Sequence, residues 1–208
     1  MTGVPPSIER DLVQYVDLVA SAEPAPGGGS VAAVVASLSA ALGAMVCRFS
    51  TGRPKLAAHE PEIRELLAGL DRRQKELLVL ARRDEAAYRL LHDAFALPRA
   101  SDAEKARRKK AIGEASRGAA HVPLLVAREA ATLVDLALRL LEIGNPNLSS
   151  DAGVMGLLAA ASCRSALLNV KVNLPGLFEE ERGTIADEVA RLEAGVETAR
   201  AGLVERIG

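Results

Sequence analysis

Aromatic residues are scarce in this sequence: they make up 2% of the 208 residues, and tryptophan is absent. Proteins that bind single-stranded nucleic acid stack bases on aromatic side chains, so the composition argues against such a surface. Neither sign of charge is in excess, because 26 basic residues stand beside 27 acidic ones and the net charge is −1. A general attraction to nucleic acid or to an anionic membrane is therefore not expected.

Cysteine and histidine are almost as rare. Cys47 and Cys163 are the only cysteines, and neither lies in a paired-cysteine motif, so neither a disulfide framework nor a zinc site is indicated. Reduced thiols in a cytoplasmic protein are the simplest interpretation. His59, His92 and His121 stand far apart, and we predict no metal, although a site assembled from distant residues stays open.

A secretion signal and a membrane span are also not expected. Residues 1–23 carry acidic side chains where a secretion signal has a basic start. The longest apolar run, 31–47, is shorter than a membrane span requires and contains Ser37, Ser39 and Gly43. A helix that is apolar on all sides is one surrounded by protein, so this run predicts a buried central helix.

What the sequence has in quantity is Ala, Leu and Val, within a hydrophobic content of 49%. Ala and Leu are strong helix formers, and 208 residues suffice for one domain with a proper core. We predict an all-α fold, with residues 1–208 forming a single-domain bundle of about six helices.

The helix limits follow from apolar spacing, caps and breaks. The segment 30–50 and the segment from about 149–151 to 173 are apolar nearly all round and rich in Ala or Gly, which predicts that they are the central helices. Pro123 is expected to bend the fourth helix, and the basic run 105–110 to be a solvated face. The remaining predicted helices are 7–22, 58–96, 102–143 and one after the Leu174-Pro175-Gly176 break.

The stretch Gly27-Gly28-Gly29-Ser30 opens the first central helix. It matches the weak nucleotide pattern GxGxxG/A, but a predicted helix precedes it where that pattern requires a strand, and no Lys-Ser/Thr pair follows. Ser30 is predicted to be the N-cap of the helix. Free N–H groups at such a start bind a carbonyl, carboxylate or phosphate; a tight turn without a ligand is the alternative.

A second polar turn precedes the other central helix and contains Asn145, Asn147, Ser149 and Asp151. A carboxylate in the first turn of a helix is stabilised in its ionised form by the helix dipole. Asp151 is therefore a candidate general base or counter-charge for a cation, and its alternative role is to cap the helix.

Further polar pairs interrupt apolar helices at a spacing of four, which places both members on one face. Asn169 and Asn173 need hydrogen-bond partners in an apolar setting. Asp84 and Tyr88 suit the lining of a cleft, or equally a surface acid beside a half-buried phenol. Two cations after the first central helix suit an anionic substrate or simple solvation: Arg53 and Lys55.

Five blocks of the sequence, in the same order, resemble the cyclodeaminase/cyclohydrolase family of folate enzymes and extend to about Leu174. The resemblance implies an all-helical dimer with folate bound in a cleft near the subunit boundary. It implies no metal or flavin cofactor, since the tetrahydrofolate derivative is the substrate. The blocks are PGGGSVAA with LGAMV, DEAAYRLLHDAFALPRASDAEKARRKKAI, HVPLLVA, GNPNLSSDAGV and ALLNVKVNL.

The activity that the resemblance implies is that of 5,10-methenyltetrahydrofolate cyclohydrolase, which hydrolyses the methenyl bridge to give 10-formyltetrahydrofolate. A stand-alone form is expected, because the chain has no room for a transferase domain. The alternatives are formiminotetrahydrofolate cyclodeaminase, which releases ammonia, and a non-catalytic helical bundle. Leu148 occupies the place of a cysteine of the bifunctional relatives, which weakens the deaminase interpretation. Ser50-Thr51-Gly52-Arg53-Pro54 also departs from the family's Thr-Ile-Gly-Lys type of sequence.

Chemistry then suggests roles for the candidates. Asp151 is the predicted base and electrostatic partner of the cationic substrate, with Asn147 and Ser149 orienting it or the water. Asp84 and Tyr88 are predicted to hold the pterin edge, the glycine turn an oxygen, and Arg53 or Lys55 the glutamate tail. The full set of predicted substrate contacts is Gly27, Gly28, Gly29, Ser30, Arg53, Lys55, Asp84, Tyr88, Asn145, Asn169 and Asn173.

Overall fold

The computed structural model describes residues 12–207. Within that range all regular structure is helical, which confirms the prediction of a six-helix all-α domain. The part of the first predicted helix before Leu12 lies outside the described residues. The α-helices are α1 (Leu12–Val19), α2 (Gly28–Ser50), α3 (Glu60–Ala96), α4 (Asp102–Ile143), α5 (Ser149–Asn173) and α6 (Glu179–Ile207), with short 3-10 helices η2 (Pro54–His59), η3 (Pro146–Leu148) and η4 (Leu174–Gly176).

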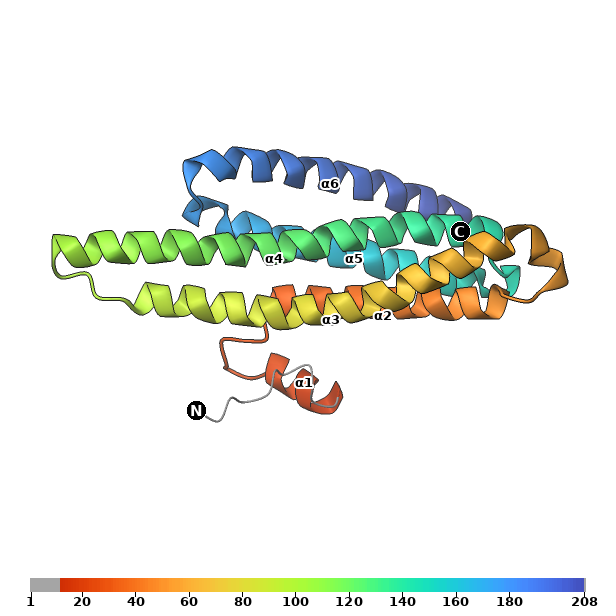
Figure 1. Ribbon diagram of the computed structural model, residues 1–208, viewed down its shortest axis with the longest axis horizontal. Helices are drawn as coiled ribbons and strands as arrows, with labels where there is room; N and C mark the ends of the chain where they lie inside the picture. Colours follow the sequence, from red (N-terminus) through yellow and green to blue (C-terminus); the bar gives the residue numbers. More distant parts are fainter. Residues whose placement is uncertain (1–11, 208) are drawn as a thin grey trace.

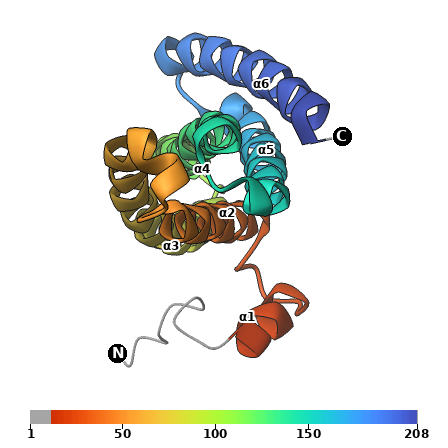
Figure 2. The ribbon, with the colours of Figure 1, turned by 90° about the vertical axis from the view of Figure 1, so that its right-hand side faces the viewer.

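Four of these helices form the bundle. Viewed down the long axis, α2, α3, α4 and α5 enclose one core, and α6 packs on the outside against α4 and α5 (Figure 2). Helix α1 stands apart on the other side, beyond α2 and α5. At one end α3 and α4 extend past the start of α2, so that their connecting turn projects from the bundle (Figure 1).

Small residues let α2 and α5 pack closely. Two buried hydroxyls bond across this helix pair: Ser39 Oγ donates to the carbonyl of Met155 at 2.8 Å, and Ser162 Oγ donates to the carbonyl of Ala32 at 2.7 Å. Gly43 allows a close approach, because a Cβ there would overlap the end of the Met155 side chain and force it to shift. Close packing thus explains why these two helices are so rich in Ala, Ser and Gly.

Both helices are also long and apolar enough to cross a membrane. In the bundle, however, 61% of the most apolar stretch of α2 and 56% of that of α5 is buried. The prediction that they are enclosed on all sides is wrong for one face of each. Leu38 is 58% exposed on α2, and Leu168 and Val172 are 62% and 79% exposed on α5. These residues are apolar, as the pattern of an enclosed helix requires, but no element of the described chain covers them.

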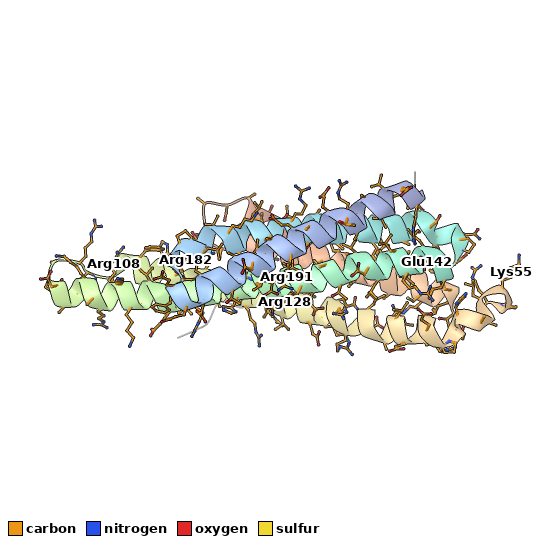
Figure 3. All side chains as sticks on the ribbon, turned by 90° about the horizontal axis from the view of Figure 1, so that it is seen from above. Lys55, Arg108, Arg128, Glu142, Arg182 and Arg191 are labelled. Atoms are coloured by element: carbon orange, nitrogen blue, oxygen red, sulfur yellow. The ribbon has the colours of Figure 1, made fainter. Side chains whose placement is uncertain are left out.

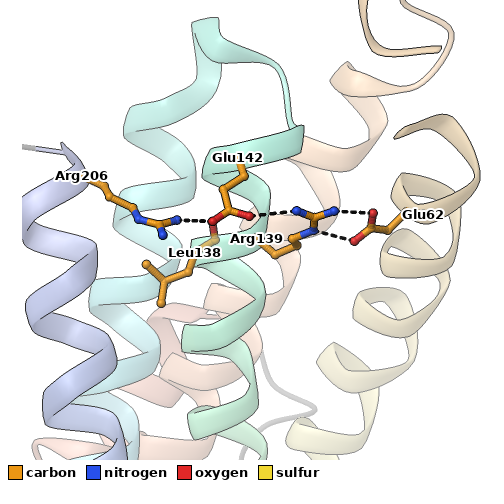
Figure 4. A network of polar contacts seen from close by, with 5 residues as sticks. All are labelled: Glu62, Leu138, Arg139, Glu142 and Arg206. Atoms are coloured by element: carbon orange, nitrogen blue, oxygen red, sulfur yellow. Dashed lines mark hydrogen bonds and ion pairs between the residues drawn. The ribbon is translucent and has the colours of Figure 1, made fainter. Parts of the chain in front are cut away.

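Ion pairs fix α3, α4 and α6 to one another near the end of α2. Arg139 of α4 pairs with Glu62 of α3 at 2.7 Å and with Glu142 at 2.9 Å, and Arg206 of α6 pairs with Glu142 at 2.6 Å (Figure 4). Exposed pairs of this kind contribute little free energy each, so their effect is to position α6 rather than to hold the fold together.

Candidate functional site

A small cleft of about 90 Å³ opens at the end of the bundle where α2 begins. It brings together seven of the residues singled out in the sequence: the three glycines, Asp84, Tyr88, Asn169 and Asn173. Four helices contribute, because α2 begins and α5 ends here while α3 and α4 pass by. The lining residues are Ala25, Gly27, Gly28, Gly29, Asp84, Glu85, Tyr88, Ala119, Asn169 and Asn173.

The glycines admit the side chains of the neighbouring helices to the backbone of α2. A Cβ on Gly29 would overlap the carboxylate of Asp84, so only glycine fits at this position. A Cβ on Gly28 would meet Asn169 Nδ2 at 3.4 Å, which is ordinary contact. The glycine requirement is therefore strict at Gly29 and loose at Gly28.

Ser30 does not cap the helix, contrary to the prediction. Helix α2 begins at Gly28, with Gly27 as the N-cap and no capping side chain. The Ser30 side chain is instead fully buried, and its Oγ donates to Glu85 Oε1 at 3.1 Å. Ser30 is the third residue of α2 and so lies past the N-cap position, and its hydroxyl interacts with Glu85 and Tyr15 instead of a backbone N–H.

Asp84 takes the place of the cap from across the bundle. The first helical hydrogen bond of α2 is that from Val31 N–H to Gly27, so the N–H groups before Val31 have no partner within the helix. The backbone N–H of Ser30 donates to the Asp84 carboxylate. Burial nevertheless raises the pKa of Asp84 to about 6, against that hydrogen bond and with help from the charge of Glu85.

Two further residues of the site were missed by the sequence analysis, Glu85 and Tyr15. Glu85 is only 3% exposed, and Arg89 Nη2 lies 4.0 Å from its second oxygen. The Tyr15 hydroxyl lies 3.1 Å from Ser30 Oγ and attaches α1 to the bundle. Burial raises the pKa of Tyr15, so the phenol stays protonated. Glu85 follows Leu77 and Ala81 at a spacing of four, which was the signal for its burial.

The asparagines occupy the far wall of the cleft. Asn173 Nδ2 donates to the carbonyl of Ala119 at 3.1 Å and to that of Asn169 at 2.9 Å. The Ala119 carbonyl is the one that Pro123, lacking an N–H, leaves without its normal helical partner. Asn173 thus replaces the hydrogen bond that the proline removes, and α4 continues unbroken past Pro123.

This pairing predicts a stability effect that depends on Pro123. We expect Asn173→Ala to destabilise the protein by about 1–3 kcal/mol, because the Ala119 carbonyl loses its donor. In a Pro123→Ala background the restored N–H binds that carbonyl, and the same substitution should cost less. Urea unfolding of the four proteins of this cycle measures the difference, and equal costs in both backgrounds would contradict the assignment.

The second polar turn lies at the opposite end of α2. The Asn145 N–H donates to Ser50 Oγ at 2.9 Å, and its side chain donates to the Phe49 carbonyl at 3.4 Å. Arg53 Nε donates to the same carbonyl at 2.6 Å. Asn145 is 4% exposed, and its Oδ1 accepts from the Asn147 N–H at 3.2 Å. These contacts hold the end of α2 against the start of α5.

The predicted site residues therefore do not gather in one place within a single chain. Helix α2 has 23 residues, and at a rise of about 1.5 Å per residue its two ends are about 33 Å apart. Figure 3 shows Lys55 and Arg108 at opposite ends of the long axis. The members that lie at the far end, away from the cleft, are Arg53, Lys55, Asn145, Asn147, Ser149 and Asp151. The cause is the up-and-down topology, which places the two helix starts at opposite ends.

Among residues 12–207, His, Cys, Asp and Glu side chains form no group of three that suits a metal ion. Both cysteines are buried and free, and burial raises the pKa of Cys47 to about 11 and that of Cys163 to about 12. Neither thiol is reactive in that state, since the thiolate is the nucleophile. The acid–base groups in the cleft are thus the carboxylates and the phenol of Tyr88.

Comparison with known proteins gives consistent matches. The sequence profile of the formiminotransferase-cyclodeaminase family matches residues 11–191. The chain is 38% identical over 195 residues to a methenyltetrahydrofolate cyclohydrolase of Methylorubrum extorquens, covering 89% of this chain and 94% of that one.

Two further matches carry the other activity in their names. A formimidoyltransferase-cyclodeaminase of Gallus gallus is 31% identical over 174 residues, which is 84% of this chain but 32% of the chicken protein. The crystal structure of a formiminotetrahydrofolate cyclodeaminase from Thermotoga maritima superimposes with a TM-score of 0.85, at 29% identity and 96% coverage of both chains.

Proposed function

The chain belongs to the formiminotransferase-cyclodeaminase family, and within it we propose that the protein is a 5,10-methenyltetrahydrofolate cyclohydrolase. The observation that carries this choice is the 38% identity to the Methylorubrum extorquens cyclohydrolase over nearly the whole of both chains. Leu148 supports it, because the family resemblance implies a cysteine at this place in the bifunctional relatives. We also propose a cytoplasmic location and no metal or organic cofactor, the folate being the substrate.

The cleft supplies the groups that this hydrolysis needs. The methenyl carbon between N5 and N10 of the substrate carries positive charge, and water adds to it with loss of a proton. Asp84 accepts that proton: its pKa of about 6 leaves it largely ionised at neutral pH yet basic enough for the task. The negative charges of Asp84 and Glu85 also favour the cationic substrate over the neutral product.

The same carboxyl completes the reaction. The carbinolamine formed by the addition breaks its carbon–N5 bond when N5 is protonated, and Asp84 returns its proton there. The hydroxyl of the carbinolamine loses its proton to solvent as the formyl C=O forms on N10. The overall reaction consumes one water and releases one proton. Asp84 therefore replaces Asp151 as our proposed acid–base residue.

The remaining residues are proposed to position the ring. The N–H groups of Gly28 and Gly29, for which residues 12–207 supply no partner within the helix, are suited to a substrate oxygen. Asn169 and Asn173 use their amide nitrogens on backbone carbonyls, which leaves their side-chain oxygens to accept from N–H groups of the pterin. The Tyr88 side chain is 46% exposed at the rim and is suited to lie against the ring.

The second candidate is formiminotetrahydrofolate cyclodeaminase, favoured by the similarity to the Thermotoga maritima structure. Two assays on the purified chain separate the candidates: the loss of methenyltetrahydrofolate absorbance above the uncatalysed rate, and the release of ammonia from the formimino substrate. Acceleration of the first without ammonia release is the result we expect. Ammonia release would favour the deaminase, and no acceleration of either reaction would contradict both enzymatic functions.

We further propose that two copies pair through the uncovered faces of α2 and α5. These faces are mostly apolar, with Ser165 as the exposed polar residue in the middle of the α5 face, and they adjoin each other, since α5 packs beside α2. Helix α1, also with exposed apolar residues, lies on the same side (Figure 2). Large exposed apolar surfaces of this kind mark protein interfaces. The residues are Val31, Val34, Leu38, Met45 and Phe49 of α2 with Val154, Leu157, Ala161, Leu168 and Val172 of α5.

The dimer explains how so small a cleft serves a large substrate. The cleft volume of about 90 Å³ is that of a few water molecules, at roughly 30 Å³ each, and is too small for a whole folate. Gly28 and Asn169 lie at the margin of the uncovered face, beside Val31, Leu168 and Val172. A second copy on that face would therefore extend the wall of the cleft.

This arrangement predicts that charge in the interface separates the copies. We expect Leu38→Glu combined with Leu168→Glu to elute as a monomer when the wild type elutes as a dimer, because each glutamate would have to be buried without a partner. Light scattering after size-exclusion chromatography gives the mass. Leu90→Glu is the matched control, since Leu90 is 64% exposed on α3, away from this face. A double variant that remains dimeric would contradict the proposed interface.

A further inference from the structure

A second and larger cavity, of about 460 Å³, lies where the α3–α4 turn meets the loop before α6. One side of it is basic, formed by Arg99, Lys105, Arg108 and Lys109. The opposite side is apolar and runs from Pro175 to Phe178. The sequence predicted the basic run to be a solvated face, whereas the structure directs part of it into this cavity.

The positive charge of the cavity is largely uncompensated. Residues 99–110 contain six basic side chains and two acidic ones. Asp102 pairs with Lys105 at 2.9 Å. Glu104 Oε2 accepts the N–H groups of Ala100 and Ser101, both at 2.8 Å, to complete a capping box. Lys110 lies 3.9 Å from Glu114, so the positive charge that remains for a ligand in the cavity is that of Arg99, Arg108 and Lys109.

Arg108 shows the clearest demand for a ligand. One of its nitrogens donates to the Phe95 carbonyl at 3.1 Å, and its guanidinium lies 5.8 Å from the centre of the Phe95 ring. Its Nε is buried and has no hydrogen-bond partner within the described part of the chain. A buried N–H without an acceptor is unfavourable, so a shift of the Arg108 side chain that brings this nitrogen to an acceptor in the cavity would be favourable.

The apolar side of the cavity is a rigid surface. A Cβ on Gly113 would overlap the Phe178 ring, and a Cβ on Gly176 would overlap Ser116. The loop before α6 is therefore packed tightly on α4. Phe178 remains 42% exposed and presents part of its ring to the cavity. A ligand that fits both sides combines anionic groups with an apolar portion.

We infer that this cavity binds a polyanion, with two or more neighbouring carboxylate or phosphate groups on the four cations and an apolar portion against Phe178. Two sources share this chemistry: the carboxylates of the folate bound in the neighbouring cleft, and a separate small polyanion. The first source rests on the proposed function. It is within reach because Asn173 lines the cleft and Pro175 lines the cavity.

Titration calorimetry with tripolyphosphate tests the cavity directly. We expect Arg99→Gln/Arg108→Gln/Lys109→Gln to bind the probe at least tenfold more weakly than wild type, and added salt to weaken the wild-type binding. The control, Arg64→Gln/Arg72→Gln/Lys75→Gln, removes the same charge from the outer face of α3 and should bind as wild type does. Equal affinities in all three proteins would overturn the inference.

A milder variant guards against a failure to fold. Lys109 is exposed, so Lys109→Glu should leave the thermal unfolding unchanged and still weaken the binding of tripolyphosphate severalfold. Unchanged binding in this correctly folded variant would also overturn the inference.

Steady-state kinetics then identify the source of the polyanion. If the folate carboxylates occupy the cavity, the triple variant has a raised KM with kcat unchanged, and tripolyphosphate competes with the substrate. If a separate polyanion occupies it, KM is unchanged and the probe binds in the presence of saturating substrate. Should the chain prove not to turn over folates, the calorimetry still decides whether the cavity binds polyanions.

Discussion

Asp84→Asn should lower kcat/KM for methenyltetrahydrofolate hydrolysis by about 10²–10⁴-fold, the usual contribution of a positioned acid–base group. The substitution keeps the shape of the side chain, and its oxygen still accepts the N–H of Ser30. It removes the ability to take a proton from water and to return it to N5. It also removes one of the two negative charges that favour the cationic substrate.

The same substitution should stabilise the fold. The pKa of Asp84 rises from an ordinary 3.8 to about 6 on folding, so the folded state holds this proton more tightly than the unfolded state does. That stabilisation is complete below pH 3.8 and is lost as the pH rises through about 6. At pH 7 the buried charge costs about 2 kcal/mol, at about 1.4 kcal/mol per pKa unit with an allowance for partial exposure.

Activity and stability can be measured on the same variant. The wild-type kcat/KM, corrected for the uncatalysed reaction at each pH, should rise with pH around pH 6 as Asp84 ionises. Urea unfolding should show Asp84→Asn more stable than wild type at pH 7 and nearly equal to it at pH 4. Full activity in Asp84→Asn would remove the residue from the mechanism, and a large loss in Asp151→Asn would restore the role first predicted for that residue.

The presence of a partly buried acid at this place could be predicted from the sequence. Ile63, Leu70, Leu77 and Leu91 follow one another at multiples of seven along α3, and all are buried. Position 84 is the one place in that series without an apolar residue, and it carries Asp84. An ionisable group at a core position is uncommon unless it has a function, so the interruption of the apolar stripe was an indication of the site.

The partner of that acid could not be predicted. Gly29 and Asp84 are 55 positions apart in the sequence. Their contact depends on the position of α2 along the axis of α3, and the packing of side chains between the two helices sets that position. The wrong prediction of Ser30 as the N-cap has the same origin. The local sequence favours a cap, whereas in the folded protein the Ser30 hydroxyl donates to Glu85, which is distant in the sequence.

The apolar faces of α2 and α5 illustrate a different limit. The hydrophobic pattern of a helix records which residues avoid water, and it does so equally whether its own chain or a second copy covers them. The sequence thus predicted two enclosed helices, and the structure of one chain leaves a face of each exposed. The six-helix fold could be predicted from the pattern within each segment. The same pattern does not distinguish an apolar face that the chain itself covers from one that it leaves exposed.

Gly29→Ala should be the most damaging change of a single methyl group in the cleft. Its Cβ would overlap the Asp84 carboxylate, and relief of such overpacking costs about 1–3 kcal/mol. Displacement of the carboxylate by about 1 Å should also lower kcat/KM by about 10²-fold. The backbone itself does not oppose alanine, because among residues 12–207 only Gly52 has a positive φ, of 74°.

Gly28→Ala is the matched control, one residue earlier in the same helical turn. Its Cβ would make ordinary contact with Asn169 at 3.4 Å, and the loss of glycine flexibility should stabilise the protein by about 0.4–1 kcal/mol. The double variant Gly29→Ala/Asp84→Ala separates the two effects of Gly29→Ala. Without the carboxylate the overlap disappears, so stability should recover while activity stays low. If Gly29→Ala is as stable as Gly28→Ala and as active as the wild type, the close approach of Asp84 to this turn is not the reason for the glycine.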